Sequence, residues 1–195
     1  MENKLLIVFS HPLFEASHVH KALLSKMPDS KHIRFIDLYE KYPFFNIDVK
    51  TEQKNLLDAD IVIFQYPIMW YSMPPILKQY IDLVFEHGWA YGTEGNKLEG
   101  KFFMEVISTG GSKDSYTATG VHQNDLLDYL KGSKQTALYC KMNYIPPFVV
   151  FGSNKLNESD LNEYANELNL ILNKLLITDL NKINFTLYEY INNWK

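Results

Sequence analysis

The stretch Asp60-Ile61-Val62-Ile63-Phe64-Gln65-Tyr66 decides how this chain folds. It is apolar almost throughout, a pattern typical of a strand that is buried on both faces of a parallel sheet. A loop bounded by Pro67 and Pro74 follows it, and Pro75 opens a helix with an apolar face that reaches Phe85. Proline is tolerated in a first helical turn because the amide at that position has no partner within the helix. The segment therefore predicts a strand, a loop and a helix.

Further apolar runs on both sides of this stretch predict more strands and helices. The strands are Leu5–Phe9, Ile33–Leu38, Phe102–Ile107 and Pro147–Phe151. The helices are one that starts at Ser17 and stops at Pro28, then Val49–Leu57, Leu126–Leu130 and Leu156–Ile177, the last capped by Asn157 or Ser159. Strands that alternate with helices predict a five-stranded parallel sheet with helices on both faces. Five strands favour the flavodoxin-like order over a six-stranded Rossmann domain.

Length and composition predict one soluble domain that spans 1–195. The chain has 195 residues, of which 46% are hydrophobic, and this is enough for a substantial core. Its net charge of −4 gives no electrostatic reason to expect nucleic acid as a partner. Cys140 is the only cysteine, which excludes an intramolecular disulfide, and the apolar run near the N-terminus is too short for a signal peptide. We therefore expect a cytoplasmic protein. Residues 178–195 form a C-terminal extension, expected as a helix on the body or on a partner subunit.

Three loops follow the carboxyl ends of predicted strands, where α/β proteins of this type bind their ligands. They are Ser10–Ser17, Pro67–Pro74 and Thr109–His122. The first loop enters a helix N-terminus, which presents free amides to an anion. It contains neither the glycine-rich dinucleotide pattern nor a P-loop.

The first loop offers one hydroxyl and several imidazoles. Ser17 has the position of a helix N-cap, which spacing alone favours over a phosphate contact. His11 has a structural alternative as well, a hydrogen bond to the backbone. No carboxylate or cysteine accompanies the histidines at ligand spacing, so no metal site is predicted.

The second and third loops have features that suit a flat ligand. Trp70 and Tyr71 lie between fixed prolines and predict a rigid apolar wall for an isoalloxazine ring, or alternatively a subunit contact. Gly110 and Gly111 let the backbone approach a ligand closely. Tyr116 and the downstream histidine of this loop are candidate donors to negative charge on a reduced ring, although each residue type is more often structural.

Taken in order, these segments resemble the flavodoxin-like NAD(P)H:quinone oxidoreductase family. The similarity is greatest to its small bacterial members, which include the ancillary protein of the glutathione-regulated potassium-efflux system. The matching segments are Ile7-Val8-Phe9-Ser10-His11-Pro12 with Ser17-His18, Tyr42-Pro43-Phe44-Phe45-Asn46-Ile47-Asp48, Trp70-Tyr71-Ser72-Met73-Pro74-Pro75-Ile76-Leu77-Lys78, His87-Gly88-Trp89-Ala90-Tyr91-Gly92, Thr109-Gly110-Gly111 and Asn143-Tyr144-Ile145-Pro146-Pro147-Phe148.

The resemblance implies a role for each site residue. The flavin phosphate would be held by His11, Ser17, His18, Val19 and His20; the isoalloxazine would be lined by Ile68, Met69, Trp70 and Tyr71; its pyrimidine end would be wrapped by Ser108, Thr109, Gly110 and Gly111; and Tyr116 and His122 would stabilise the reduced flavin. Two positions depart from the family pattern. His20 replaces a frequent asparagine, and Met69 replaces a common glutamine.

The resemblance also implies a function. FMN, or FAD as in longer relatives, would take a hydride from NAD(P)H and pass it to a quinone or a similar flat acceptor in a two-electron ping-pong reaction. A homodimer with the pocket at the subunit interface is expected. The alternatives are a flavin-binding regulatory subunit of a potassium-efflux transporter, peripheral at the inner face of the cell membrane, and a one-electron flavodoxin carrier.

Overall fold

The computed structural model describes residues 2–192 and 194, and its centre is one parallel sheet. The strands are β1 (Leu5–Phe9), β2 (Ile33–Asp37), β3 (Ile61–Pro67), β4 (Phe102–Ser108), β5 (Asn143–Tyr144) and β6 (Phe148–Val150). Their order is β2-β1-β3-β4-β5. β5 pairs with the first residues of β4, and β6 pairs with the last residues of the same strand. Every pairing is parallel. The flavodoxin-like α/β fold is thus confirmed, with two short strands in the fifth place.

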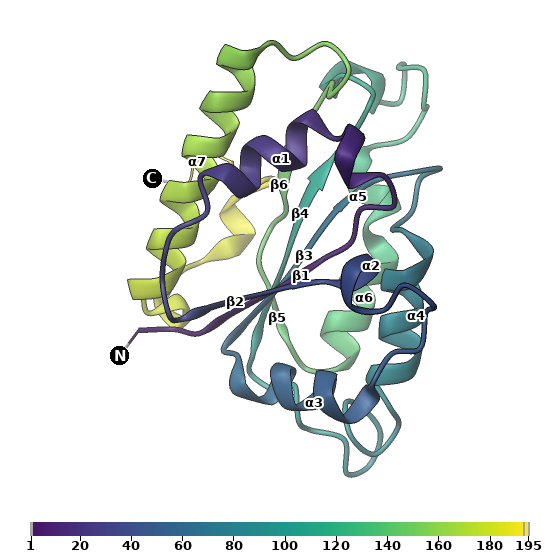
Figure 1. Ribbon diagram of the computed structural model, residues 1–195, viewed down its shortest axis with the longest axis vertical. Helices are drawn as coiled ribbons and strands as arrows, with labels where there is room; N and C mark the ends of the chain where they lie inside the picture. The colour runs from purple at the N-terminus through teal and green to yellow at the C-terminus, as the bar shows by residue number, and fades with distance from the viewer. Residues whose placement is uncertain (1, 193, 195) are drawn as a thin grey trace.

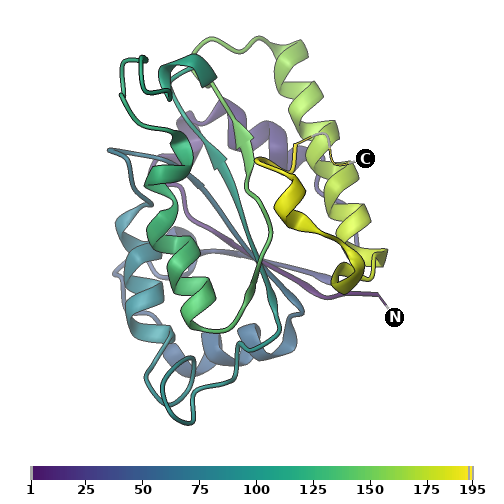
Figure 2. The same ribbon diagram turned by 180° about the vertical axis from the view of Figure 1, so that it is seen from behind.

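Helices cover both faces of this sheet, as the two opposite views show (Figure 1, Figure 2). One face carries α1 (His18–Ser25) and α7 (Glu158–Ile177). The opposite face carries α2 (Leu38–Lys41), α3 (Val49–Asp58), α4 (Pro75–Val84), α5 (Leu126–Tyr129) and α6 (Lys131–Tyr139). None of the described helices is long and apolar enough to cross a membrane.

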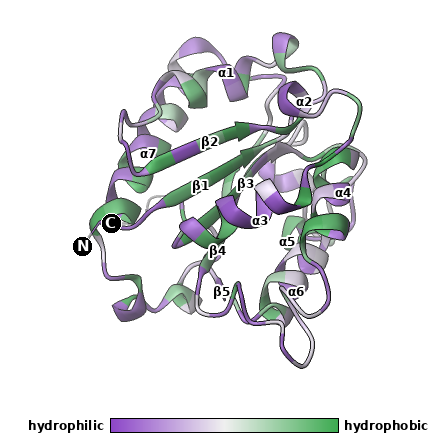
Figure 3. Cartoon of the chain, turned by 60° about the horizontal axis from the view of Figure 1, so that its bottom comes forward, coloured by the Kyte–Doolittle hydropathy of each residue, from purple (hydrophilic) through white to green (hydrophobic). Residues whose placement is uncertain are grey.

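The strands divide their side chains between the two layers because successive residues point to opposite faces. In β1, Leu6 and Val8 pack with the layer of α3 and α4, whereas Leu5 and Ile7 pack with α1 and α7. All five residues of β1 are buried. In Figure 3 the strands β1 and β3 are largely green, whereas the helices around them carry both green and purple residues. The continuous apolar runs of the sequence follow from this burial on both faces.

Most elements match their predicted positions. The N-terminal boundary of α7 could be predicted because a capping residue marks it. Asn157 is its N-cap: its side chain accepts hydrogen bonds from two backbone amides, and Asp160 completes a capping box. Three elements, α2, β5 and α6, were missed. The first two are only 4 and 2 residues long. The helix α6 was not predicted because Gly132, Ser133 and Thr136 interrupt the apolar periodicity that is typical of a helix.

The described residues of the extension do not form the expected α-helix. It contains two 3₁₀ turns, η3 (Leu180–Lys182) and η4 (Phe185–Leu187), and its apolar side chains join the layer of α7. Ile191 donates its amide to the carbonyl of Pro147 at 3.0 Å. The Asn192 side chain bonds the Val149 amide at 2.9 Å and the Val149 carbonyl at 3.2 Å. The extension therefore packs on this chain's own body, along the outer edge of β6.

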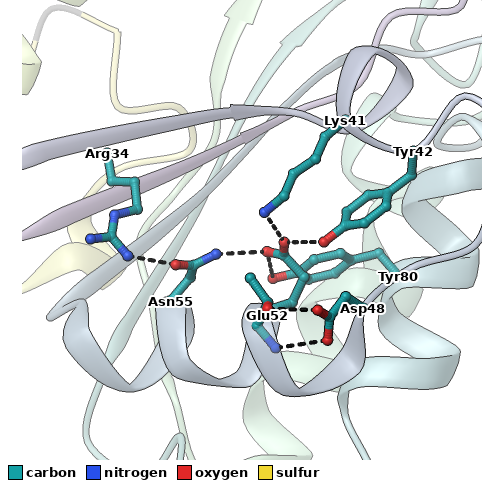
Figure 4. A network of polar contacts seen from close by, with 8 residues as sticks. Arg34, Lys41, Tyr42, Asp48, Glu52, Asn55 and Tyr80 are labelled. Atoms are coloured by element: carbon teal, nitrogen blue, oxygen red, sulfur yellow. Dashed lines mark hydrogen bonds and ion pairs between the residues drawn. The ribbon is translucent and has the colours of Figure 1, made fainter.

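A buried carboxylate fastens α3 to its neighbours (Figure 4). Glu52 is fully buried, and one of its oxygens accepts from Lys41 Nζ and from the Tyr42 hydroxyl, both at 2.6 Å. Its other oxygen accepts from Asn55 Nδ2 at 3.1 Å. A charge in this position is tolerated only because each lone pair finds a donor. The network joins α3 to α2 and to the residue that follows α2.

We expect Glu52→Gln to lower the free energy of unfolding by about 2 kcal/mol, since it leaves the Lys41 ammonium without its counter-charge. Urea denaturation followed by circular dichroism measures this. The matched control is Glu163→Gln on the exposed side of α7, which should change stability by less than about 0.5 kcal/mol. Equal stability of the two variants would show that the network contributes nothing.

Candidate active site

The carboxyl ends of β1, β3 and β4 lie at the upper right in Figure 1, and hydrogen bonds there join the second loop, the end of β4 and the start of α1. Ile68, after β3, donates its amide to the carbonyl of Ser108 at 2.9 Å. The Oγ of Ser108, at the end of β4, lies 3.0 Å from Nε2 of His20 on α1. The parallel register predicts this meeting, since Pro67 and Ser108 are direct neighbours. The structure thus brings the three predicted loops to one place.

The first loop presents donors to an anion at the start of α1. Ser17 is the N-cap, and its Oγ accepts from the backbone amide of His20 at 3.1 Å, which bears out the capping interpretation. The first helical amides, those of His18 and Val19, precede the intrahelical ladder and remain donors. His11 Nδ1 accepts from the Leu13 amide at 3.1 Å, so Nε2 carries the proton when the ring is neutral.

His20 has no free ring nitrogen for an anion at the start of α1, because both of its ring nitrogens have partners within the protein. It is fully buried, and its Nδ1 lies 3.4 Å from the side-chain amide of Gln65 on β3. Gln65 can only donate through that nitrogen, so His20 Nδ1 accepts and its Nε2 donates to Ser108. Burial, and secondarily the nearby His11, lower the pKa of His20 to about 3. The ring is therefore a neutral link between α1, β3 and β4.

The Ser10 side chain, directly after β1, is buried without a hydrogen-bond partner in the protein. Among the described residues, its Oγ is the only buried side-chain oxygen or nitrogen without a hydrogen-bond partner. Native proteins rarely leave such a group unpaired, and an exception calls for an explanation such as a bound ligand. A buried hydroxyl without a partner, directly after β1 in the first loop, fits a phosphate-bearing cofactor better than it fits a purely structural loop.

The second loop contains an unusual turn. Met69 and Ser72 exchange backbone hydrogen bonds of 3.0 and 3.2 Å, and the two residues between them have φ values of 48° and 64°. Trp70 and Tyr71 thus occupy the left-handed region, at a cost of about 1–3 kcal/mol each. The Trp70 side chain is 93% exposed. Strained backbone that displays an aromatic ring is typical of a ligand or interface site.

The third loop assembles an aromatic group. The rings of Tyr116 and His122 stack with centroids 4.3 Å apart, and the Tyr71 hydroxyl lies 3.4 Å from His122 Nδ1. Burial raises the pKa of Tyr116, so its phenol stays protonated at neutral pH. An added Cβ on Gly111 would come within 2.9 Å of His122 Nε2, which shows why this position favours glycine.

Sequence reasoning missed two residues of this site. Tyr129 on α5 stacks on Tyr71 with centroids 4.9 Å apart and donates its hydroxyl to the His122 carbonyl at 3.3 Å. Gln65 was assigned only to a strand, and Tyr129 only to a helix. His20 had a signal that was not used: it lies three residues before the buried Leu23, on the inward face of α1.

Gly110 and its neighbours hold the third loop against β6. Thr109 donates its amide to the Val150 carbonyl and its hydroxyl to the Gly111 carbonyl, at 2.9 and 2.8 Å. The Gly111 carbonyl also accepts from the Gly152 amide at 2.9 Å.

Within the part of the chain that the structure describes, no group of three or more potential metal ligands comes together.

Comparison with known proteins agrees with this architecture. Residues 3–172 match the family described as having a flavodoxin-like fold, and the chain belongs to that family. The Bacillus subtilis protein YrkL, described as an uncharacterized NAD(P)H oxidoreductase, is 39% identical over 165 residues, covering 85% of this chain and 95% of YrkL.

Two solved structures are similar over most of the chain. General stress protein 14 of Treponema denticola, in complex with FMN, is 33% identical with a TM-score of 0.82, covering 88% of this chain and 99% of that one. A chain described as a thermophilic tryptophan halogenase from Streptomycin violaceusniger is 34% identical with the same TM-score, covering 89% and 99%. The named activities of these relatives differ, so the shared fold does not by itself define one activity.

Because His20 is neutral in the folded protein, we predict how folding stability depends on pH. Its folded pKa lies below the unfolded value of 6.5, so only the unfolded chain takes up a proton at this residue as the pH falls below 6.5. Folding stability is therefore lost through this group between pH 6.5 and about 3. From pH 7 to pH 5 we expect His20→Asn to lose about 2 kcal/mol less stability than the wild type.

Urea denaturation at each pH measures this difference. His18→Asn, which changes an exposed neighbour in the same helical turn, is the control and should keep the wild-type pH dependence. An unchanged pH dependence in His20→Asn would contradict a neutral buried imidazole.

Proposed function

We propose that this protein is an FMN-dependent NAD(P)H oxidoreductase that reduces quinones or similar flat acceptors. The observation that carries the proposal is the hydrogen bonding of Ser108, at the end of β4, to Ile68 of the second loop and to His20 of α1, together with a buried, unpartnered Ser10 hydroxyl directly after β1. The oxidoreductase name of YrkL and the FMN complex of the Treponema denticola relative support it.

The first loop is proposed to hold the flavin phosphate. The amides of His18 and Val19 and the protonated Nε2 of His11 supply donors, and the positive end of the α1 dipole favours the anion. We assign Ser17 to capping and His20 to positioning, because both ring nitrogens of His20 already have protein partners.

The second and third loops are proposed to hold the flavin ring. Ile68 to Tyr71 would line it, and Ser108 to Gly111 would wrap its pyrimidine end. The side chain of Met69 is 43% exposed while its backbone is fixed by Ser72, so a backbone contact with the flavin does not need the family's glutamine. When bound, FMN supplies hydride acceptance from NAD(P)H and hydride donation to the second substrate.

Tyr116 and His122 are proposed as the catalytic residues. The protonated Tyr116 phenol is a hydrogen-bond donor, and stacking on His122 fixes the two rings together. Preorganised donors of this kind stabilise developing negative charge without reorganising during the reaction. Tyr71 and Tyr129 hold His122 from its side chain and from its backbone, at 3.4 and 3.3 Å.

We further propose that a second copy of the chain covers this site. Each of the three loops displays a large apolar side chain to solvent: Leu13 is 66% exposed, Trp70 93% and Val121 86%. Apolar exposure concentrated around one site is typical of a protein–protein interface. The alternative of a regulatory subunit for a potassium-efflux transporter, located at the membrane, stays a prediction from the sequence resemblance.

The decisive experiment is an absorbance spectrum of purified protein after incubation with FMN or FAD and removal of free flavin. We expect bound FMN, bleaching of its visible bands by anaerobic NADH or NADPH, and recovery of the bands on addition of a quinone. Retained flavin that NAD(P)H does not bleach would contradict the oxidoreductase proposal. A stable blue flavin radical on titration would favour a one-electron carrier instead.

We expect His122→Ala to lower turnover on the order of 100-fold, the size of effect seen when one preorganised donor is lost. Flavin content should stay near the wild-type level, since the phosphate loop is untouched. His32→Ala, which changes a histidine at the opposite end of the sheet, is the matched control. Full activity in His122→Ala would remove this residue from the mechanism.

A further inference from the structure

A cavity lies at the edge of the sheet formed by its last strands, on the side of the C-terminal extension. It is an open groove of about 670 Å³ beside β5, between α5–α6 on one side and the C-terminal extension on the other. Figure 2 shows these walls, the green helices and the yellow extension, with the last strands between them. The apolar lining of this edge groove includes Leu127, Leu130, Leu138, Met142, Ile183 and Phe185.

The wall formed by the extension is an ordered part of the protein. Leu180 and Phe185 are buried in the layer of α7, and Ile191 and Asn192 bond the outer edge of β6. The family match ends at residue 172, so this wall lies beyond it. The extension pairs with β6 but leaves the outer side of β5 facing the groove. The edge groove is therefore a feature of this chain's own extension.

The charged groups of the edge groove point to an anion. It is lined by two lysines and one acid, Glu189, which lies 4.0 Å from Lys113 outside the groove. Lys131 is paired with Asp128 at 2.7 Å. Lys134 has no ion pair within the described residues, and its Nζ is held 5.2 Å above the centre of the Tyr144 ring. An ammonium positioned next to an apolar wall lacks a counter-charge.

We propose that the edge groove binds an amphipathic monoanion, a small molecule with an apolar body and one carboxylate. The apolar body would lie against the leucines of α5 and α6 and Phe185, and the carboxylate would pair with Lys134. The volume falls within the range of about 300–1,000 Å³ that is usual for small-molecule sites. Specific sites commonly combine an apolar lining with one or two placed charges, as this groove does.

Three ligands with the same ten-carbon chain and different head groups test the proposal. Decanoate, decanol and decyltrimethylammonium are titrated into the full-length protein by calorimetry, with and without saturating FMN. We expect decanoate to bind at one site per chain, more tightly than decanol, and decyltrimethylammonium to bind least. Decanoate binding should be the same with FMN present. Competition with FMN, binding at many equivalent sites, or preference for the cation would each overturn the proposal.

Charge reversal locates the site. Lys134→Glu changes an exposed residue, so it should leave the fold intact, which thermal unfolding checks. We expect it to weaken decanoate binding about tenfold or more, the loss expected for one charge-assisted contact, and to strengthen binding of the cation. Lys54→Glu, which changes an exposed lysine on α3, is the matched control and should bind decanoate like the wild type.

A steric variant tests the apolar wall independently of charge. Leu138 is 46% exposed and lines the groove, so Leu138→Trp fills space without disturbing a buried layer. We expect it to weaken decanoate and decanol binding together. Unchanged decanoate binding in both Lys134→Glu and Leu138→Trp would place the ligand elsewhere and refute the assignment.

Discussion

The candidate site depends on the hydrogen bonds of one residue, Ser108, at the end of β4. Its carbonyl accepts a hydrogen bond from the Ile68 amide at the start of the second loop, and its hydroxyl accepts one from Nε2 of His20 on α1. It also continues the parallel register that places β3 and β4 side by side. Loops are usually the least constrained parts of an α/β protein, yet here the start of the second loop and the helix that follows the first loop are both bonded to the residue from which the third loop departs.

Buried polar groups place strict demands on the rest of this fold. His20 is tolerated inside the layer between sheet and α1 because it is neutral and because both of its nitrogens are bonded. Glu105 is likewise fully buried on β4, where the hydroxyls of Tyr66 and Tyr144 donate to its two oxygens at 2.6 and 3.0 Å. Each arrangement specifies one packing of neighbouring elements, since any shift would leave a polar atom without a partner.

Much of this architecture was predictable because burial on both faces leaves continuous apolar runs, as in β1 and β3. The position of the candidate site was predictable too, since parallel strands deliver their carboxyl ends to one edge. Tyr129 and Gln65 were not, because their importance lies in contacts between segments distant in sequence. The α6 helix was missed for a different reason: its glycine and hydroxyl residues give no periodic signal, and packing against the sheet stabilises it instead.

The pairing of Asn192 with β6 has a consequence for the behaviour of the protein in solution. An edge strand with free amides and carbonyls is a template for aggregation, and proteins commonly cover such edges with another segment. One side-chain amide here satisfies both backbone groups of Val149, as a neighbouring strand would. The extension thus shields the outer edge of β6 from adding strands of other molecules, and a chain cut short before Ile191 would lose that shield.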